Sequence, residues 1–174
     1  AQELTQLKHA PVAKPYSGPV LLEPEASAVF IHEVIGHRME SHRLKQSSDG
    51  QTFRQKIHDA IMDPQFDLVD DPTLHHHEGT PLNGHYQYDD QGVAARPAHL
   101  ITNGVLKGFL ESRSTSSDST QSNGHGRGNI HLPAVSRMGN TWLQSSKGIP
   151  YDSLRQLFKT ELKLSFNFLI IDKR

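Results

Sequence analysis

The sequence contains no cysteine, which rules out disulfide bonds and leaves the cellular compartment undecided. Long apolar runs are also missing: no stretch approaches the roughly 18 apolar residues of a membrane-spanning helix, so we expect a soluble protein without a membrane partner. Positive charge is not in excess, because 18 Lys and Arg residues stand against 19 Asp and Glu residues. We therefore expect no direct nucleic-acid partner, since such binding usually leaves a basic patch.

Two histidines flank a glutamate in the segment His32-Glu33-Val34-Ile35-Gly36-His37. Neutral imidazoles bind Zn²⁺ well, and a neighbouring glutamate can take a proton from a metal-activated water. On an ideal α-helix, residues i and i+5 stand about 140° apart, so His32 and His37 would diverge. We therefore predict a π-bulge or a break near Gly36, where the backbone deforms most cheaply. The alternative is a buried amphipathic helix whose polar residues face a groove.

The motif lies in a helix that we expect to begin at Pro24 and to end near Lys45. Proline is tolerated in the first turn of a helix, and the acidic Glu25 complements the helix dipole. The segment Ser47-Ser48-Asp49-Gly50 that follows favours the end of the helix. Five apolar residues approximate the buried face of this helix: Val29, Ile31, Val34, Ile35 and Met39.

Beyond this helix the pattern favours strands. Residues 66–69 predict a short strand, residues 86–88 a strand that meets a turn at 89–92, and residues 98–101 and 105–110 a hairpin around Asn103-Gly104. A final amphipathic helix is predicted from Tyr151 to about Leu164. The fold class is therefore α+β: a long HExxxH-bearing helix packed on mostly antiparallel strands, with a C-terminal helix, in a single domain over 1–174.

Several further segments rich in histidine or small residues are less specific. Residues 112–129 contain many Ser, Thr and Gly residues, so we favour a mobile surface loop there, with an active-site loop as the alternative. His75-His76-His77 is flanked by turn residues, which favours a solvated loop over a metal site. His42 is not expected to extend the site unless the helix distortion persists.

The segment from His32 to Glu40 resembles the signature helix of the TldD/PmbA family, proposed zinc metallopeptidases also called modulators of DNA gyrase. Further matches follow in the order of that family, and several weak motifs in one order are more specific than any one alone. The resemblance covers roughly residues 15–150. The matching segments are 69–73, 84–86, 89–93, 101–110, 122–127 and 137–141.

The resemblance implies a zinc-dependent metallopeptidase in which His32 and His37 bind the metal and Glu33 is the catalytic base. Peptides or unfolded proteins are the implied substrates, and the cytoplasm is the implied location. A catalytic zinc usually has three protein ligands. The third ligand in the family is thought to be a cysteine in its C-terminal part, which this sequence lacks, so the third ligand is not identified.

Two other functions stay open. The chain can be a non-catalytic partner subunit of a homo- or heterodimer, because the family contains paired members. It can also be a histidine-rich metal-binding module, although such a module has no need of Glu33 as a base beside the metal. The N-terminal α/β region of the family has no counterpart in the sequence, so we expect a truncated or partial chain.

Overall fold

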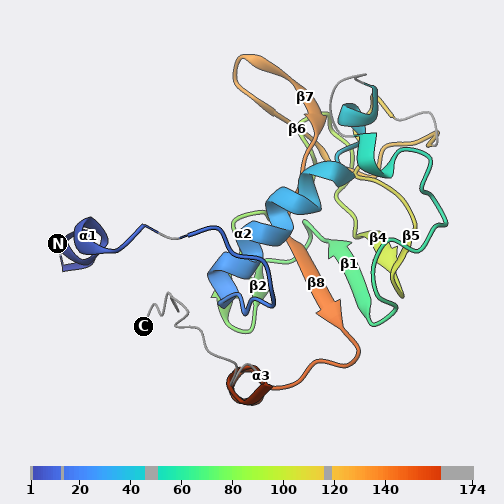
Figure 1. The fold of residues 1–174 in the computed structure, drawn as a ribbon. Helices are drawn as coiled ribbons and strands as arrows, with labels where there is room; N and C mark the ends of the chain where they lie inside the picture. Colours follow the sequence, from blue (N-terminus) through green and yellow to red (C-terminus); the bar gives the residue numbers. More distant parts are fainter. Residues whose placement is uncertain (1, 13, 46–50, 116–118, 162–174) are drawn as a thin grey trace.

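A four-stranded antiparallel sheet forms the centre of the computed structural model, which describes residues 2–12, 14–45, 51–115 and 119–161 (Figure 1). The strand order is β5-β4-β1-β8, so β1 lies inside the sheet. Two separate two-stranded units, β2–β3 and β6–β7, accompany this sheet. The strands are β1 (Phe66–Asp70), β2 (His76–His77), β3 (Thr80–Pro81), β4 (Ala98–Thr102), β5 (Val105–Leu106), β6 (Gly126–Asn129), β7 (Leu132–Ser136) and β8 (Thr141–Ser145).

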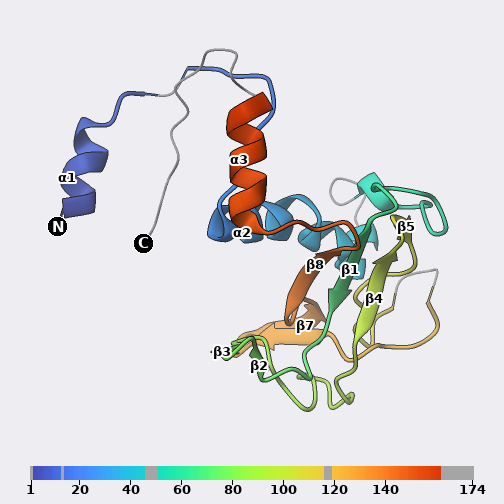
Figure 2. The same ribbon diagram turned by 90° about the horizontal axis from the view of Figure 1, so that it is seen from below.

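Three α-helices and three short 3₁₀ segments complete the described part. In Figures 1 and 2, α2 lies beside the sheet, α3 stands near the N-terminal end of α2, and α1 lies apart from the rest. The Tyr151 hydroxyl of α3 donates a hydrogen bond to the Glu23 carboxylate, directly before α2. The bounds are α1 (Gln2–His9), α2 (Pro24–Val34) and α3 (Tyr151–Glu161), with 3₁₀ segments at Gly36–Met39, Ser41–Lys45 and Gln51–Phe53.

The predicted combination of helices with a mostly antiparallel sheet and a C-terminal helix is confirmed. The start of α2 at Pro24 is as predicted, with Pro24 in the first turn. The last helix is described from Tyr151 to Glu161, and the predicted continuation to Leu164 lies outside the described residues. No helix within the described ranges is both long and apolar enough to cross a membrane.

The turn at Asn103-Gly104 forms the hairpin that the sequence predicts. Asn103 and Gly104 have φ angles of 49° and 74°, the positive values that a type I′ turn requires. They connect β4 to β5 through the pairs Ile101↔Leu106 and Thr102↔Val105. A side chain on Gly104 would also approach the Met62 carbonyl oxygen to 2.4 Å, so both conformation and space favour glycine here.

The hydrophobic core lies between the central sheet and the 3₁₀ segments that follow α2. The predicted buried face of α2 is wrong at Val29 and Val34, which are 61% and 39% exposed. Ile31 is partly buried and packs against the core, and Ile35 and Met39, which follow the helix, belong to the core. The buried apolar residues of the core are Ile35, Met39, Leu44, Leu68, Ala98, Leu100, Ile101, Leu106, Phe109, Leu110 and Met138.

The strand predicted over residues 86–88 is reduced to a single bridge between Tyr88 and Ala94. The turn that follows it is present and is organised by one buried carboxylate. The Asp89 side chain accepts hydrogen bonds from the backbone amides of Gln91 and Val93, both at 2.9 Å. These bonds fold the chain back on itself before a longer strand can form.

Candidate metal centre

The α-helix that carries His32 and Glu33 ends at Val34, so the predicted continuation to Lys45 is wrong. The Arg38 amide donates to the Ile35 carbonyl, which begins a 3₁₀ turn, and the Arg38 guanidinium donates to the Val34 carbonyl. This side-chain bond satisfies an oxygen that the ending helix leaves without its usual partner. The backbone thus changes near Gly36, as the spacing of the histidines requires, but through a 3₁₀ segment and not a π-bulge.

Gly36 allows close packing at this break. A β-carbon on Gly36 would lie 2.3 Å from the Met138 sulfur, far inside contact distance. The 3₁₀ segment begins at Gly36, and the φ angle of Gly36 does not fall in the left-handed region, so the close approach of Met138 also favours glycine here. Gly36 and the Met138 side chain, about 100 residues further along the sequence, therefore lie in close contact at the break.

The break brings His32, Glu33 and His37 together. Each residue offers one ligating atom, and these atoms all lie within 4.8 Å of one another. The two imidazole rings are 4.7 Å apart at 80°, and His37 Nε2 lies 3.8 Å from Glu33 Oε2. His32 and Glu33 are exposed and His37 is partly buried, so an ion from solvent can reach all three. Among the described residues, this donor set fits a zinc ion.

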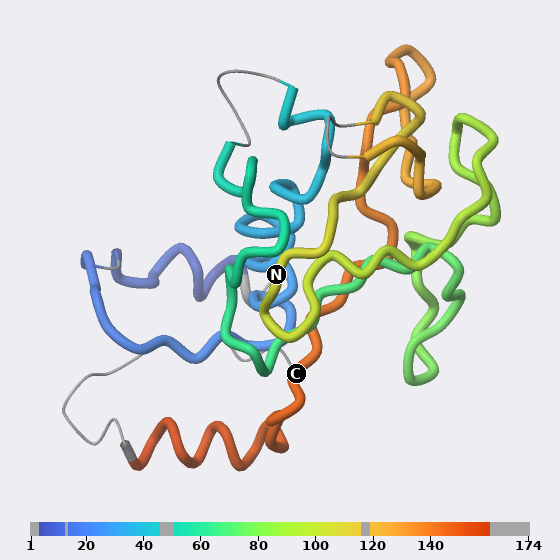
Figure 3. Tube along the Cα trace, turned by 90° about the vertical axis from the view of Figure 1, so that its right-hand side faces the viewer, coloured from blue at the N-terminus to red at the C-terminus, as the bar shows by residue number. Residues whose placement is uncertain are grey.

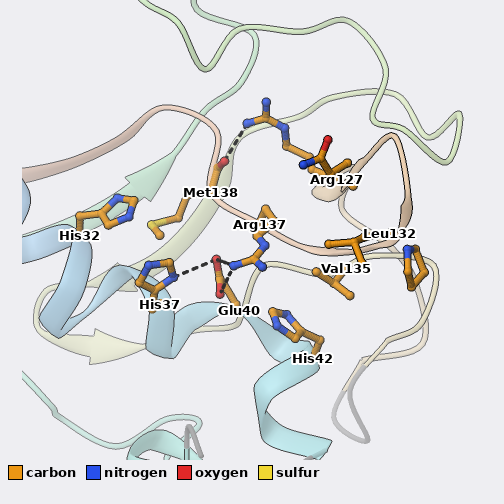
Figure 4. Close-up of a pocket in the computed structure, with 12 residues that line it drawn as sticks. His32, His37, Glu40, His42, Arg127, Leu132, Val135, Arg137 and Met138 are labelled. Atoms are coloured by element: carbon orange, nitrogen blue, oxygen red, sulfur yellow. Dashed lines mark hydrogen bonds and ion pairs between the residues drawn. The ribbon is translucent and has the colours of Figure 1, made fainter.

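A buried carboxylate lies behind His37. The side chain of Glu40 is fully buried, and its Oε1 lies 3.1 Å from His37 Nδ1 (Figure 4). Two arginines hold the same carboxylate: Arg43 Nε donates to Oε2 at 2.8 Å, and Arg137 Nη1 lies 3.4 Å from both oxygens. Glu40 thus occupies one nitrogen of His37 and leaves the other facing His32 and Glu33.

The two histidines open into a pocket of about 590 Å³. One wall comes from the end of α2 and the segments after it, and the opposite wall comes from the β6–β7 hairpin, which projects from the body of the molecule (Figures 1 and 3). Apolar and arginine side chains share this second wall. The lining residues are His32, His37, Glu40, His42, Arg127, Gly128, Asn129, Leu132, Pro133, Val135, Arg137 and Met138.

His42 lines the pocket but does not join the close group of ligating atoms. Burial lowers the pKa of His42 below its usual value, and its Nδ1 has no hydrogen-bond partner among the described residues. The tract at His75-His76-His77 lies elsewhere. The three histidines are exposed, as predicted, but His76 and His77 form the short strand β2 and not a loop, and the ring centroids of His75 and His85 stack at 3.4 Å.

Residues 122–125 correct the prediction of a mobile loop over 112–129. His125 is fully buried, with Nε2 3.1 Å from Asp70 Oδ1 and Nδ1 2.9 Å from Asn123 Oδ1. Asn123 in turn donates to the Phe109 carbonyl at 2.8 Å. His125 does not line the pocket, but Arg127, Gly128 and Asn129 of the same predicted segment do, so the segment contributes to the pocket wall.

Sequence reasoning gave no role to Glu40, Arg137 or Asp70, although all three lie in segments that match the family. Glu40 ends the matching signature, and Arg137 and Asp70 belong to matching segments further along the chain. The sequence feature that could have identified these residues was the presence of a charged residue inside each matching segment. The contacts that give these residues their roles join positions up to 97 residues apart and cannot be derived from spacing.

Comparison with known proteins places the chain in a metallopeptidase family. A family model described as the PmbA/TldA metallopeptidase C-terminal domain matches residues 15–162, and the chain belongs to this family, TldD/PmbA. The resemblance noted in the sequence is therefore confirmed.

Curated relatives carry metalloprotease names. A metalloprotease of Methanocaldococcus jannaschii is 34% identical over 126 residues, covering 72% of this chain and 26% of the relative. A zinc metalloprotease TldD homolog of Saccharolobus solfataricus is 31% identical over 159 residues, covering 90% of this chain and 33% of the relative. The chain thus spans about a quarter to a third of the length of these relatives.

Solved structures show the same fold. TldE from Thermococcus kodakarensis superposes with a TM-score of 0.58 at 22% identity, covering 73% of this chain and 28% of that protein. A Thermotoga maritima protein whose name calls it a modulator of a DNA gyrase gives a TM-score of 0.52 at 20% identity, covering 66% of this chain and 24% of that protein. At these identities the likeness concerns the fold alone.

Proposed function

We propose that the chain carries the metal centre of a zinc-dependent metallopeptidase. His32 and His37 hold the zinc ion, and Glu33 is the catalytic base. The observation that carries this proposal is the approach of their ligating atoms to within 4.8 Å of one another, across a break in the helix that the i and i+5 spacing requires. The name of the Saccharolobus solfataricus relative supports the choice of zinc.

Zinc, when bound, supplies the Lewis acid that activates water and polarises a peptide carbonyl. The Glu33 side chain is 62% exposed and lies beside His37 Nε2, so it can take a proton from a water bound beside the two histidines. The guanidinium of Arg137 and the apolar side chains of Leu132 and Val135 line the opposite wall. This mixture of apolar and cationic surface suits a peptide or unfolded-protein substrate.

A non-catalytic partner role is the second candidate. The described cluster offers two histidines besides Glu33, and the sequence has no cysteine, whereas a catalytic zinc usually takes three protein ligands. The likeness of fold to TldE supports a TldD/TldE-type hetero-oligomer, in which such a chain would pair with a catalytic subunit. In the catalytic alternative, the third ligand lies outside the cluster that the described residues form.

Calorimetric titration of zinc into the 174-residue chain, together with a peptide-cleavage assay, separates these roles. We expect weak binding that weakens further as the pH falls, because ligating imidazoles must be neutral. His32→Ala should abolish this binding. Glu33→Gln should retain it and abolish any hydrolysis, because the amide is nearly isosteric but is not a base.

His76→Ala is the matched control, because His76 is exposed and lies outside the cluster. Unchanged zinc binding in His32→Ala, or its loss in His76→Ala, would overturn the proposed metal site. Zinc binding without any hydrolysis by the wild-type chain would favour the partner role.

A further inference from the structure

We propose that Glu40 is a positioning residue that holds His37 in the tautomer with its hydrogen on Nδ1. This tautomer leaves Nε2 with a free lone pair on the side of His32 and Glu33. The consequence for metal binding rests on the proposed function, whereas the tautomer itself is a property of the metal-free chain.

The contact geometry carries the proposal. Glu40 Oε1 lies 3.1 Å from His37 Nδ1, a hydrogen-bond distance, whereas Glu33 Oε2 lies 3.8 Å from Nε2, beyond one. A carboxylate accepts hydrogen bonds and cannot donate them. Arg43 Nη2, which can only donate, also approaches Nδ1, but only to 3.5 Å. The shorter carboxylate contact at 3.1 Å therefore places the ring hydrogen on Nδ1. Histidines that bind metals commonly donate a hydrogen bond from their other ring nitrogen to a carboxylate in this way.

Backbone bonds on both sides hold Glu40 in place. The Leu110 amide donates to the Met39 carbonyl at 2.8 Å, and the Ser41 amide donates to the Leu110 carbonyl at 3.1 Å. The Ser41 hydroxyl also lies 2.8 Å from the Ser136 hydroxyl of β7. Glu40 is thus fixed against the core on one side and against the β6–β7 hairpin on the other, so its carboxylate has little freedom to follow a rotating His37 ring.

The charge of Glu40 is compensated from outside the metal cluster. Arg43 Nε donates to Oε2 at 2.8 Å, and Arg137 approaches both oxygens at 3.4 Å. A buried carboxylate needs such partners, because an unpaired buried charge is strongly unfavourable. With two arginines present, Glu40 does not depend on a protonated His37 for compensation. The neutral imidazole that a metal requires is therefore compatible with this buried acid.

The tautomer is measured by ¹⁵N NMR of the histidine side chains in the metal-free 174-residue chain, at about pH 8, where imidazoles are ordinarily neutral. The signal of His37 is assigned by its loss in His37→Gln. We expect a protonated Nδ1 and a bare Nε2 for His37. A wild-type His37 with its hydrogen on Nε2 overturns the proposal, whatever any variant does.

The Glu40→Gln variant tests whether Glu40 determines the tautomer of His37. An amide can donate as well as accept, so we expect His37 to populate both tautomers in this variant, and zinc affinity to fall about 10- to 100-fold. Asp70→Asn is the matched control, because Asp70 is an equally buried carboxylate on another histidine, and the tautomer of His37 should not change in it. An unchanged tautomer in a folded Glu40→Gln chain overturns the proposal.

The two proposals fail differently. A wild-type chain that binds no zinc but shows the Nδ1–H tautomer, with both tautomers populated in Glu40→Gln, contradicts the proposed metal site and supports the positioning role. A chain that binds zinc at His32 and His37 with the other tautomer supports the metal site and contradicts the role of Glu40. If Glu40→Gln does not fold, the wild-type tautomer alone decides.

Discussion

Two buried carboxylates in this molecule each contact one imidazole, and the two pairs have different surroundings. Glu40 Oε1 lies 3.1 Å from His37 Nδ1, and Asp70 Oδ1 lies 3.1 Å from His125 Nε2. Both carboxylates are fully buried. His125 is fully buried as well, whereas 28% of the His37 side chain is exposed. The same contact therefore occurs once inside the protein and once at the edge of a pocket.

The two histidines differ in the surroundings of their second ring nitrogen. His125 Nδ1 faces the Asn123 side-chain oxygen at 2.9 Å, so both nitrogens of this ring are used inside the protein. His37 Nε2 faces the exposed Glu33 and the neighbouring His32. A carboxylate–imidazole pair thus cross-links the structure when both nitrogens are enclosed, and orients a ligand when one nitrogen remains open.

The carboxylates also differ in what they hold besides the histidine. Asp70 ends the inner strand β1 and accepts hydrogen bonds from the Gly139 amide and the Thr141 hydroxyl, which join β1 to the start of β8. Glu40 lies between two 3₁₀ segments and is held by arginine side chains. Loss of the first pair should therefore affect stability, and loss of the second should affect metal binding.

The largest effect on stability is expected for His125→Ala. It leaves the buried Asp70 carboxylate without its imidazole partner and should lower the free energy of unfolding by about 1–3 kcal/mol, the usual cost of leaving a buried hydrogen-bonding group without a partner. Chemical denaturation followed by circular dichroism measures this change. Zinc affinity of the folded variant should equal that of the wild type. A stable variant with altered zinc affinity would reverse the assignment of the two histidines.

A smaller effect on stability is expected for His37→Ala. Glu40 keeps both arginines in this variant, so the loss is close to that of one hydrogen bond, about 0.5–1.5 kcal/mol. Zinc binding should nevertheless disappear. The same denaturation experiment and a zinc titration provide the two measurements. A loss of stability as large as that of His125→Ala would show that the His37 pair is a structural cross-link too.

The smallest effect on stability is expected for His42. This histidine lines the pocket, and its Nδ1 has no hydrogen-bond partner among the described residues. Burial is the main reason why its pKa is lowered, the nearby Arg137 and Arg43 act in the same direction, and Glu40 opposes them. Because the folded state disfavours the charged ring, the stabilising contribution is complete above about pH 6.5 and is lost as the pH falls from there toward the lowered pKa.

His42→Gln removes this dependence. The difference in unfolding free energy between wild type and His42→Gln should change between about pH 8 and about pH 5, with the wild type losing relative stability at the lower pH. The other histidines are present in both chains, so the difference isolates His42. A difference that does not vary with pH would contradict the role of burial at this ring.

Local signals in the sequence predicted the parts of the fold that local geometry determines. Asn103-Gly104 specifies its turn through two positive φ angles, and Pro24 marks the first turn of α2. The residues of the candidate site were also predicted from the motif and its spacing. The roles of His32, Glu33 and His37, and the single-domain organisation over 1–174, stay predictions.

Distant contacts determine the parts that the sequence did not predict. α2 ends where Arg38 reaches back to Val34 and where Gly36 meets Met138, and the second of these contacts joins remote parts of the chain. The exposed Val29 shows that periodicity identifies an apolar face but not what covers it. Glu40 and its partner Arg137 are 97 residues apart, so only the folded structure shows their contact.

The most direct test of the proposed metal centre is anomalous difference density at the zinc absorption edge, from crystals of the 174-residue chain grown with zinc. We predict that the strongest peak lies about 2.0–2.1 Å from a ring nitrogen of His32 and from His37 Nε2, the usual zinc–imidazole distance. Glu40 should still contact His37 Nδ1. A strongest peak at His75-His76-His77, or no peak between His32 and His37, would contradict the account.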